Sequence, residues 1–289
     1  MTFTNRQNAI RLIISLLSVT TLFASAACGS ASAASGGSQA ATNPLAQETI
    51  TPGTLTIATG EPAYTPFVID NKPETGKGFE SALAYAVGEK MGFKKDQIQW
   101  TRTTFDSAIA PGAKDYDMNI QQFGITEERK KAVDFTPSYY NAAQALVVRK
   151  DSKYASATSV QDFKGATIGA MVGTTSYDMA KSKLKSDIKT FNDNVAVAQA
   201  VDANQIDALV VDSTVAVNIV KTQQVHNAKV VGQIPDSEDP NGTGILLPKG
   251  SKLTKAASQA ITDLEKDGTL KRLQDTWLKE YTTDIPVLK

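Results

Sequence analysis

The sequence predicts an α/β fold in which parallel sheets carry helices on both faces. Two observations predict this class: short apolar runs typical of buried strands recur from residue 54 onward, and segments with helical periodicity lie between several of them. Alternation of this kind is characteristic of βαβ units. Residues 53–289 are long enough for one large or two medium-sized domains.

The individual elements follow from local composition. The tract TLTIAT predicts a first strand at 54–59, and a helical pattern covers 80–91 and ends near Gly92. Another helix is expected after Thr126, because threonine is a good N-cap and Glu127 and Glu128 place negative charge in the first turn. Further short strands are predicted at 116–120, 145–148, 167–171, 207–211 and 229–231.

Residues 1–27 have the pattern of a signal peptide. Arg6 and Arg11 precede an apolar run at 12–27, and no acidic residue occurs before Glu48. A transmembrane anchor is the alternative, but a bilayer span needs about 20 apolar residues. This run is shorter and is interrupted by serines and threonines, which favours export.

The apolar run ends in Ser25-Ala26-Ala27-Cys28, which resembles a bacterial lipobox, although Ser25 stands where leucine or valine is usual. The resemblance implies that Cys28 is lipidated and begins the mature chain. Residues 28–52 are rich in Ser, Ala and Gly and predict a flexible tether. The protein is therefore expected to be exported and anchored to the outer face of the cell membrane.

Composition excludes several kinds of function. The signal peptide contains two of the 30 basic residues and none of the 30 acidic ones, so the remaining chain is close to neutral and unsuited to nucleic acid. Cys28 is the only cysteine, so no internal disulfide can form. His226 is the only histidine, which gives a metal site or a histidine-dependent triad little basis. No metal or cofactor is expected.

The main functional signal lies at residues 121–140, QQFGITEERKKAVDFTPSYY. From the helix pattern alone, the run that begins at Arg129 would be a solvated surface. The segment nevertheless resembles the signature of the polar amino-acid solute-binding proteins of ABC importers, G-x-T-x-T-x-E-R-x-x-x-x-D-F-S-x-x-Y-Y. The matching residues are Thr126, Glu128, Arg129, Asp134, Phe135, Thr136, Tyr139 and Tyr140.

Other tracts resemble the same family in the same order, from about residue 54 to 281. They are TLTIATGEPAYTPF, GKGFESALAYAV, FDSAIAPGAKDYDMNI, GATIGAMVGTTSYDMA, DALVVDST, GTGILLPKGSKL and the terminal helix pair LEKDGTLKRLQDTW. The resemblance implies the two-lobed periplasmic-binding-protein fold of type II, with a mostly parallel sheet in each lobe. Lobe one would comprise 53–140 and 241–289, and lobe two 141–240, with hinge crossings near 140–144 and 235–240.

The charged residues suit a zwitterionic ligand, because burying either end of a free amino acid without a partner costs several kcal/mol. Arg129 can grip a carboxylate through two parallel hydrogen bonds. The turn Gly173-Thr174-Thr175 resembles the second-lobe carboxylate contacts of the family; an ordinary strand-to-helix turn is the alternative. Asp212 follows an apolar strand and is expected to hold the α-ammonium group, unless it is a plain N-cap.

The remaining candidates would surround the ligand side chain. Tyr64 and Phe105 match aromatic walls in the family, although either could be a core residue. Glu61 would disfavour an acidic side chain. Three positions depart from the family pattern. Gln122 replaces a glycine, Gly124 replaces a hydroxyl residue, and Met171 is uncharged where some relatives carry a base.

The resemblance implies a binding protein, acting as a monomer, that captures a neutral or cationic polar amino acid between its lobes. It would present the closed form to an ABC permease with its ATPase subunits and perform no chemistry. Two alternatives remain open. One is a dehydratase-like enzyme on the same fold, with Glu61 as the only evident acid. The other is an extracellular amino-acid sensor with a separate signalling partner.

Overall fold

The computed structural model describes residues 43–184, 188–282 and 285–289. The predicted signal peptide, Cys28 and most of the tether lie outside the described residues. The chain divides into two units, Met1–Ala40 and Ala41–Lys289, and the fold given below is that of the second unit. Among the described residues, no helix is both long and apolar enough to cross a membrane.

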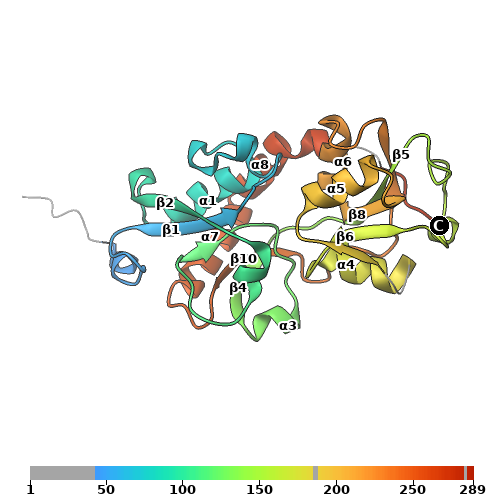
Figure 1. The fold of residues 1–289 in the computed structure, drawn as a ribbon. Helices are drawn as coiled ribbons and strands as arrows, with labels where there is room; N and C mark the ends of the chain where they lie inside the picture. The colour runs from blue at the N-terminus through green and yellow to red at the C-terminus, as the bar shows by residue number, and fades with distance from the viewer. Residues whose placement is uncertain (1–42, 185–187, 283–284) are drawn as a thin grey trace, which may run out of the picture. The chain divides into compact units, whose positions relative to one another are not determined.

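The second unit contains two five-stranded sheets (Figure 1). The first sheet, which defines lobe one, has the order β2-β1-β3-β10-β4 and the second, which defines lobe two, the order β7-β6-β8-β5-β9. The strands are β1 Leu55–Gly60, β2 Ile98–Thr103, β3 Met118–Asn119, β4 Val133–Tyr140, β5 Gln144–Arg149, β6 Ile168–Met171, β7 Lys189–Phe191, β8 Ala208–Asp212, β9 Ala228–Gln233 and β10 Thr243–Pro248.

One strand in each sheet runs against the others. Strand β10 is antiparallel to both of its neighbours, with Leu246 opposite Asn119 and Phe135. Strand β5 occupies the same place in the second sheet and is antiparallel to β8 and β9. The other pairings are parallel, so the mostly parallel α/β architecture expected from the sequence is confirmed.

The helices pack on the faces of these sheets. Lobe one carries α1 Phe79–Lys90, α2 Phe105–Ile109, α3 Glu127–Lys130, α7 Thr254–Lys266 and α8 Thr269–Trp277, and lobe two carries α4 Thr175–Met179, α5 Asn194–Asp202 and α6 Ser213–Lys221. In β8, Ala208 and Val210 belong to one apolar cluster and Leu209 and Val211 to another. Burial on both faces explains why this strand is an uninterrupted apolar run.

The chain ends on the second sheet. Gln233 of β9 receives a hydrogen bond from the Leu288 amide at 2.9 Å and donates one to the Pro286 carbonyl at 2.8 Å. Leu288 is buried in the apolar cluster that contains Phe163. The family resemblance implied that all of 241–289 belongs to lobe one. The last residues instead pack on lobe two, because the apolar Leu288 is buried in the core of that lobe.

Candidate functional site

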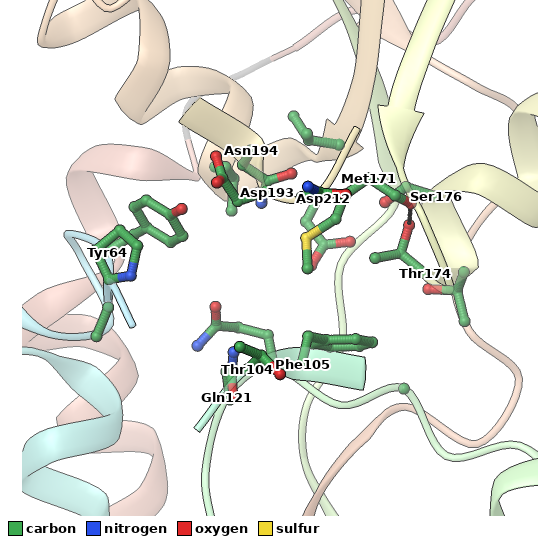
Figure 2. Close-up of a pocket in the computed structure, with 18 of the residues that line it drawn as sticks. Tyr64, Thr104, Phe105, Gln121, Met171, Thr174, Ser176, Asp193, Asn194 and Asp212 are labelled. Atoms are coloured by element: carbon green, nitrogen blue, oxygen red, sulfur yellow. Dashed lines mark hydrogen bonds between the residues drawn. The ribbon is translucent and has the colours of Figure 1, made fainter. Parts of the chain in front are cut away.

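A cavity lies at the carboxyl ends of the central strands, with both lobes contributing to its wall (Figure 2). Every ligand-site candidate from the sequence lines it except Gly173. Lobe one supplies Glu61, Tyr64, Phe105, Gln122, Gly124 and Arg129, and lobe two supplies Met171, Thr174, Thr175 and Asp212. Ligands of open α/β sheets bind at this position, where the strands end and loops diverge.

Arg129 is buried at the floor of the cavity, with 8% of its surface exposed. Its backbone amide donates to the Thr126 hydroxyl at 3.1 Å, which confirms Thr126 as the N-cap of α3. Its guanidinium donates to the Gly124 carbonyl at 2.6 Å and, across to lobe two, to the Gly173 carbonyl at 2.8 Å. Gly173 does not line the cavity, but its carbonyl holds the Arg129 guanidinium. The solvated-surface interpretation does not apply to this residue.

The surroundings of Arg129 keep its cation oriented. The guanidinium lies 5.2 Å from the centre of the Phe105 ring, a cation–π arrangement. Phe105 also packs against Phe123, with ring centres 4.8 Å apart, so it is a core residue as well as a wall. Burial lowers the pKa of Arg129, but a guanidinium stays protonated in proteins. The cavity therefore presents a fixed positive charge.

Asp212 supplies the opposite charge from lobe two. It ends β8 and is the N-cap residue of α6 by position, but its side chain makes no capping hydrogen bond, so its carboxyl is not used as a helix cap. Its Oδ1 accepts a hydrogen bond from the side-chain Nε2 of Gln144 at 2.6 Å. Burial raises the pKa of Asp212 to about 6, while that hydrogen bond and Arg129 act in the opposite direction. Asp212 is thus a desolvated carboxyl available to a cation.

The turn before α4 is fixed by the side chain of Thr174. The Thr174 hydroxyl donates to the Met171 carbonyl at 2.7 Å and caps the helix by accepting from the Tyr177 amide at 3.1 Å. The N-cap alternative for Thr174 is thereby confirmed, and this hydroxyl is already engaged. The amides of Thr175 and Ser176 begin the helix, where backbone donors have no partner within the helix.

Gln144 connects these groups and was not predicted from the sequence. Its side chain is 1% exposed. Its Nε2 donates to Asp212, and its Oε1 accepts a hydrogen bond from the Ser176 hydroxyl at 2.6 Å. A buried amide that is bonded at both ends fixes the orientation of both neighbours. Gln144 begins β5, and nothing in its local sequence distinguishes it from a strand-edge residue.

The far end of the cavity carries acidic and aromatic groups (Figure 2). Tyr64 projects into it, and burial together with Asp193 raises the pKa of its phenol to about 12. Asp193 lines the same region and caps α5 by accepting from the Ala196 amide at 2.8 Å. The Oε1 of Gln121 is buried there without a hydrogen-bond partner among the described residues.

Glu61 lies at the rim, with 55% of its side chain exposed and its Oε2 3.7 Å from Arg102 Nε. Its charge is therefore partly compensated, which the sequence did not indicate. Gln122 has a left-handed backbone with φ of 51°. Its amide donates to Glu80 Oε1 at 2.9 Å and its side chain donates to Glu80 Oε2, so Glu80 beneath the cavity fixes Gln122.

Two lobes that line one cavity, with a fixed cation from one and a desolvated carboxyl from the other, define a binding protein for a small solute. Residues 55–280 match the family described as bacterial extracellular solute-binding proteins, family 3, and the chain belongs to that family. The membership and the two-lobed fold expected from the sequence are thus confirmed.

Individual relatives cover most of the chain. The L-cystine-binding protein TcyJ of Escherichia coli (strain K12) is 30% identical over 229 residues, which are 78% of this chain and 82% of the relative. The arginine-, lysine-, histidine-binding protein ArtJ of Geobacillus stearothermophilus is similar in structure, with a TM-score of 0.66, 26% identity, and coverage of 81% and 96% of the two chains.

A third relative bears on the enzyme alternative. The ancestral amino acid-binding protein AncCDT-1, a precursor of cyclohexadienyl dehydratase, superimposes with a TM-score of 0.65 at 31% identity, over 78% of this chain and 95% of the other. It is itself described as a binding protein. The family and these relatives are binding proteins, in agreement with the expectation of a non-enzyme.

Proposed function

We propose that the protein is the substrate-binding component of an ABC importer and captures a polar α-amino acid, cationic or neutral, between its lobes. One observation carries the proposal: Arg129 from lobe one and Asp212 from lobe two line the same cavity. A zwitterion that bridges them has both charges paired, which offsets the several kcal/mol that burying each unpaired charge would cost.

The α-carboxylate would replace backbone contacts of Arg129 and reach the amides of Thr175 and Ser176 at the start of α4. The α-ammonium group would lie against Asp212, which Gln144 holds in place. Because these partners belong to different lobes, the ligand stabilises the closed state by its differential affinity for it.

The side-chain end of the cavity favours a cation. With Arg129 and Asp212 engaged by the backbone of the ligand, Asp193 and Glu61 remain as acidic groups, and no basic side chain other than Arg129 lines the cavity among the described residues. Tyr64 adds an aromatic face that can pack an aliphatic stem or a cation. The names of ArtJ and TcyJ indicate cationic and disulfide-containing amino acids for those relatives, which is consistent with a long ligand here.

The cellular arrangement belongs to the same proposal. A permease with its ATPase subunits would receive the closed, loaded form, and the protein would act as a monomer. Lipid on Cys28 would hold it at the outer face of the membrane, with the segment up to residue 52 as the tether. Membership of an extracellular solute-binding family supports export.

The dehydratase-like alternative is less well supported. It needs a desolvated acid that can protonate a leaving hydroxyl, and Glu61, the candidate from the sequence, lies exposed at the rim beside Arg102. A sensor without import would bind ligand in the same way and is distinguished only by its partner.

Isothermal titration of the chain from residue 28 onward against the common amino acids tests the proposal. We expect one or a few ligands to bind with micromolar or tighter affinity and to be recovered unchanged by mass spectrometry. Chemical conversion of the ligand would favour the enzyme, and no heat with any amino acid would contradict amino-acid capture.

Affinity is expected to depend on pH through Asp212. Because burial raises its pKa to about 6 in the free protein, the carboxyl is ionised above that pH and pairs with the ligand ammonium. As pH falls through 6 the carboxyl becomes protonated, so the dissociation constant should rise by up to about tenfold per pH unit. Titrations at pH 8, 7, 6 and 5 measure this, together with proton release on binding near pH 6. A constant affinity over this range would show that Asp212 does not hold the ammonium.

A further inference from the structure

Asp239 belongs to the segment that returns the chain from lobe two to lobe one, and its carboxylate reaches both lobes. Oδ2 accepts a hydrogen bond from the Thr175 hydroxyl at 3.2 Å. The backbone carbonyl of Asp239 accepts from the Asn141 side chain of the first crossing at 3.0 Å and from the Gly242 amide at 2.9 Å. One residue thus connects α4 with both hinge crossings.

The same carboxylate lies against Gly124 of lobe one. A Cβ placed on Gly124 would be 2.3 Å from Asp239 Oδ2 and 3.0 Å from Thr175 Cγ2. The first distance is shorter than real Cβ contacts allow. Gly124 does not have the left-handed backbone that would require glycine. A side chain at this position, where the resembled family has a hydroxyl residue, would therefore force the Asp239 carboxylate to move, and Gly124 leaves it in place.

Asp239 does not line the cavity itself, but its neighbours do. Thr175, Gly124 and Arg129 are all part of the cavity wall. Burial lowers the pKa of Arg129, and among the carboxylates that act against this effect Asp239 is the strongest, ahead of Asp178 and Asp212. Asp239 thus provides a counter-charge for the guanidinium and a hydrogen-bond acceptor for the Thr175 hydroxyl.

We propose that Asp239 is a positioning residue for the carboxylate end of the ligand site and that Gly124 leaves the space that its carboxylate occupies. The inference rests on the proposed function. With the lobes closed, the carboxylate fills the space above Gly124, holds Thr175 from lobe two and faces Arg129 from lobe one. It aligns the two groups that receive the α-carboxylate without touching the ligand. Preorganisation of this kind increases affinity by removing the cost of ordering these groups on binding.

A double-mutant cycle in the same protein tests the proposal. Asp239→Ala removes the acceptor, and Gly124→Ala displaces it by steric conflict, so each single variant should bind the ligand about tenfold or more weakly, as expected for a lost hydrogen bond to a charged group. Because both changes disrupt the same contact, the double variant should be no weaker than either single variant. Asp239→Asn retains an acceptor for Thr175 but not the counter-charge, so it should recover the part of the loss that is due to the hydrogen bond.

The control is Glu238→Ala, which removes the same charge from an exposed neighbour on the same crossing and should leave affinity unchanged. Independent losses that multiply in the double variant, or wild-type affinity in Asp239→Ala, would overturn the inference while leaving amino-acid capture intact. If the wild-type protein bound no amino acid, the proposed function would fail, and the same cycle measured by unfolding of the free protein would still decide whether the two residues are coupled.

Discussion

Replacing Arg129 with alanine is expected to weaken ligand binding by about a hundredfold or more. Removing one member of a buried, hydrogen-bonded charge pair typically costs 2–5 kcal/mol or more, and about 1.4 kcal/mol corresponds to tenfold. The α-carboxylate would enter a cavity with no other lining cation among the described residues. Arg129→Lys should recover little, because an ammonium is a single point charge and cannot make two parallel hydrogen bonds in the plane of a carboxylate.

Lys130→Ala is the matched control for this prediction. Lys130 follows Arg129 in α3, but it is directed to solvent and pairs with Glu127 at 2.7 Å. Its removal should leave the dissociation constant within about twofold of wild type, since exposed ion pairs contribute little. Titration calorimetry on both variants, with thermal unfolding to verify that each is folded, makes the comparison. Affinity in Arg129→Ala within a few-fold of wild type would place the carboxylate elsewhere.

The second large effect is expected at Glu80, where alanine should destabilise the free protein by about 3 kcal/mol or more. Glu80 is fully buried. It accepts hydrogen bonds from the Tyr139 hydroxyl, the Gln122 amide and the Gln122 side chain. Without the carboxyl these donors remain buried and unpaired, at about 1–3 kcal/mol each. Urea unfolding of wild type and Glu80→Ala measures the difference, and equal midpoints would contradict it.

The pH dependence of stability provides the finer test at Glu80. Burial raises the pKa of Glu80 to about 7 from an ordinary value of 4.5, against the opposing hydrogen bonds from Tyr139 and Gln122. The folded state therefore keeps a proton that the unfolded chain releases. The stabilising contribution is complete below about pH 4.5 and is lost as pH rises through 7, in total about 3 kcal/mol.

Glu80→Gln, which is isosteric and does not titrate, provides the reference for that test. Wild type should lose stability relative to this variant between pH 5 and 8, while the titration of Asp212, whose charge is the smallest of the influences on Glu80, is common to both proteins and largely cancels. Unfolding curves collected at each pH unit measure this difference in stability. If the two proteins follow parallel profiles, Glu80 is ionised in the folded state throughout the range.

The sequence predicted best those residues whose type and local position already indicate the role that they have in the structure. Thr126 is a good N-cap by residue type, and it caps α3 in the structure. Asp212 follows a run of apolar residues that are buried on both faces of β8, so its position at the end of a central strand could be predicted. Asp193 was not found in this way, because the strand before it, β7, is a short edge strand with no buried residue; only its residue type, suited to the N-cap of α5, distinguishes it.

Strands with weak local signals were not predicted. In β2, only Ile98 is fully buried, because the strand lies at the edge of its sheet. Strand β4 is the other edge and contains Pro137 in an exposed stretch, which the sequence indicated only as part of a signature. The roles of Gln144 and Asp239 depend on contacts between segments far apart in the chain, such as that of Asp239 with Gly124. Periodicity and local composition contain no information about such contacts.

The place of β10 in the first sheet determines the order in which the chain can fold. Residues 243–248 lie between β3 and β4, where Leu246 pairs with Asn119, so this sheet cannot be completed until most of the chain is available. The strands of the second sheet all lie within one uninterrupted run, from Gln144 to Gln233. Contacts between sequence-distant segments form slowly, because the intervening loop must close first. The five strands of the second sheet can therefore pair early, whereas the first sheet is completed later, and the packing of Leu288 on lobe two also waits for the end of the chain.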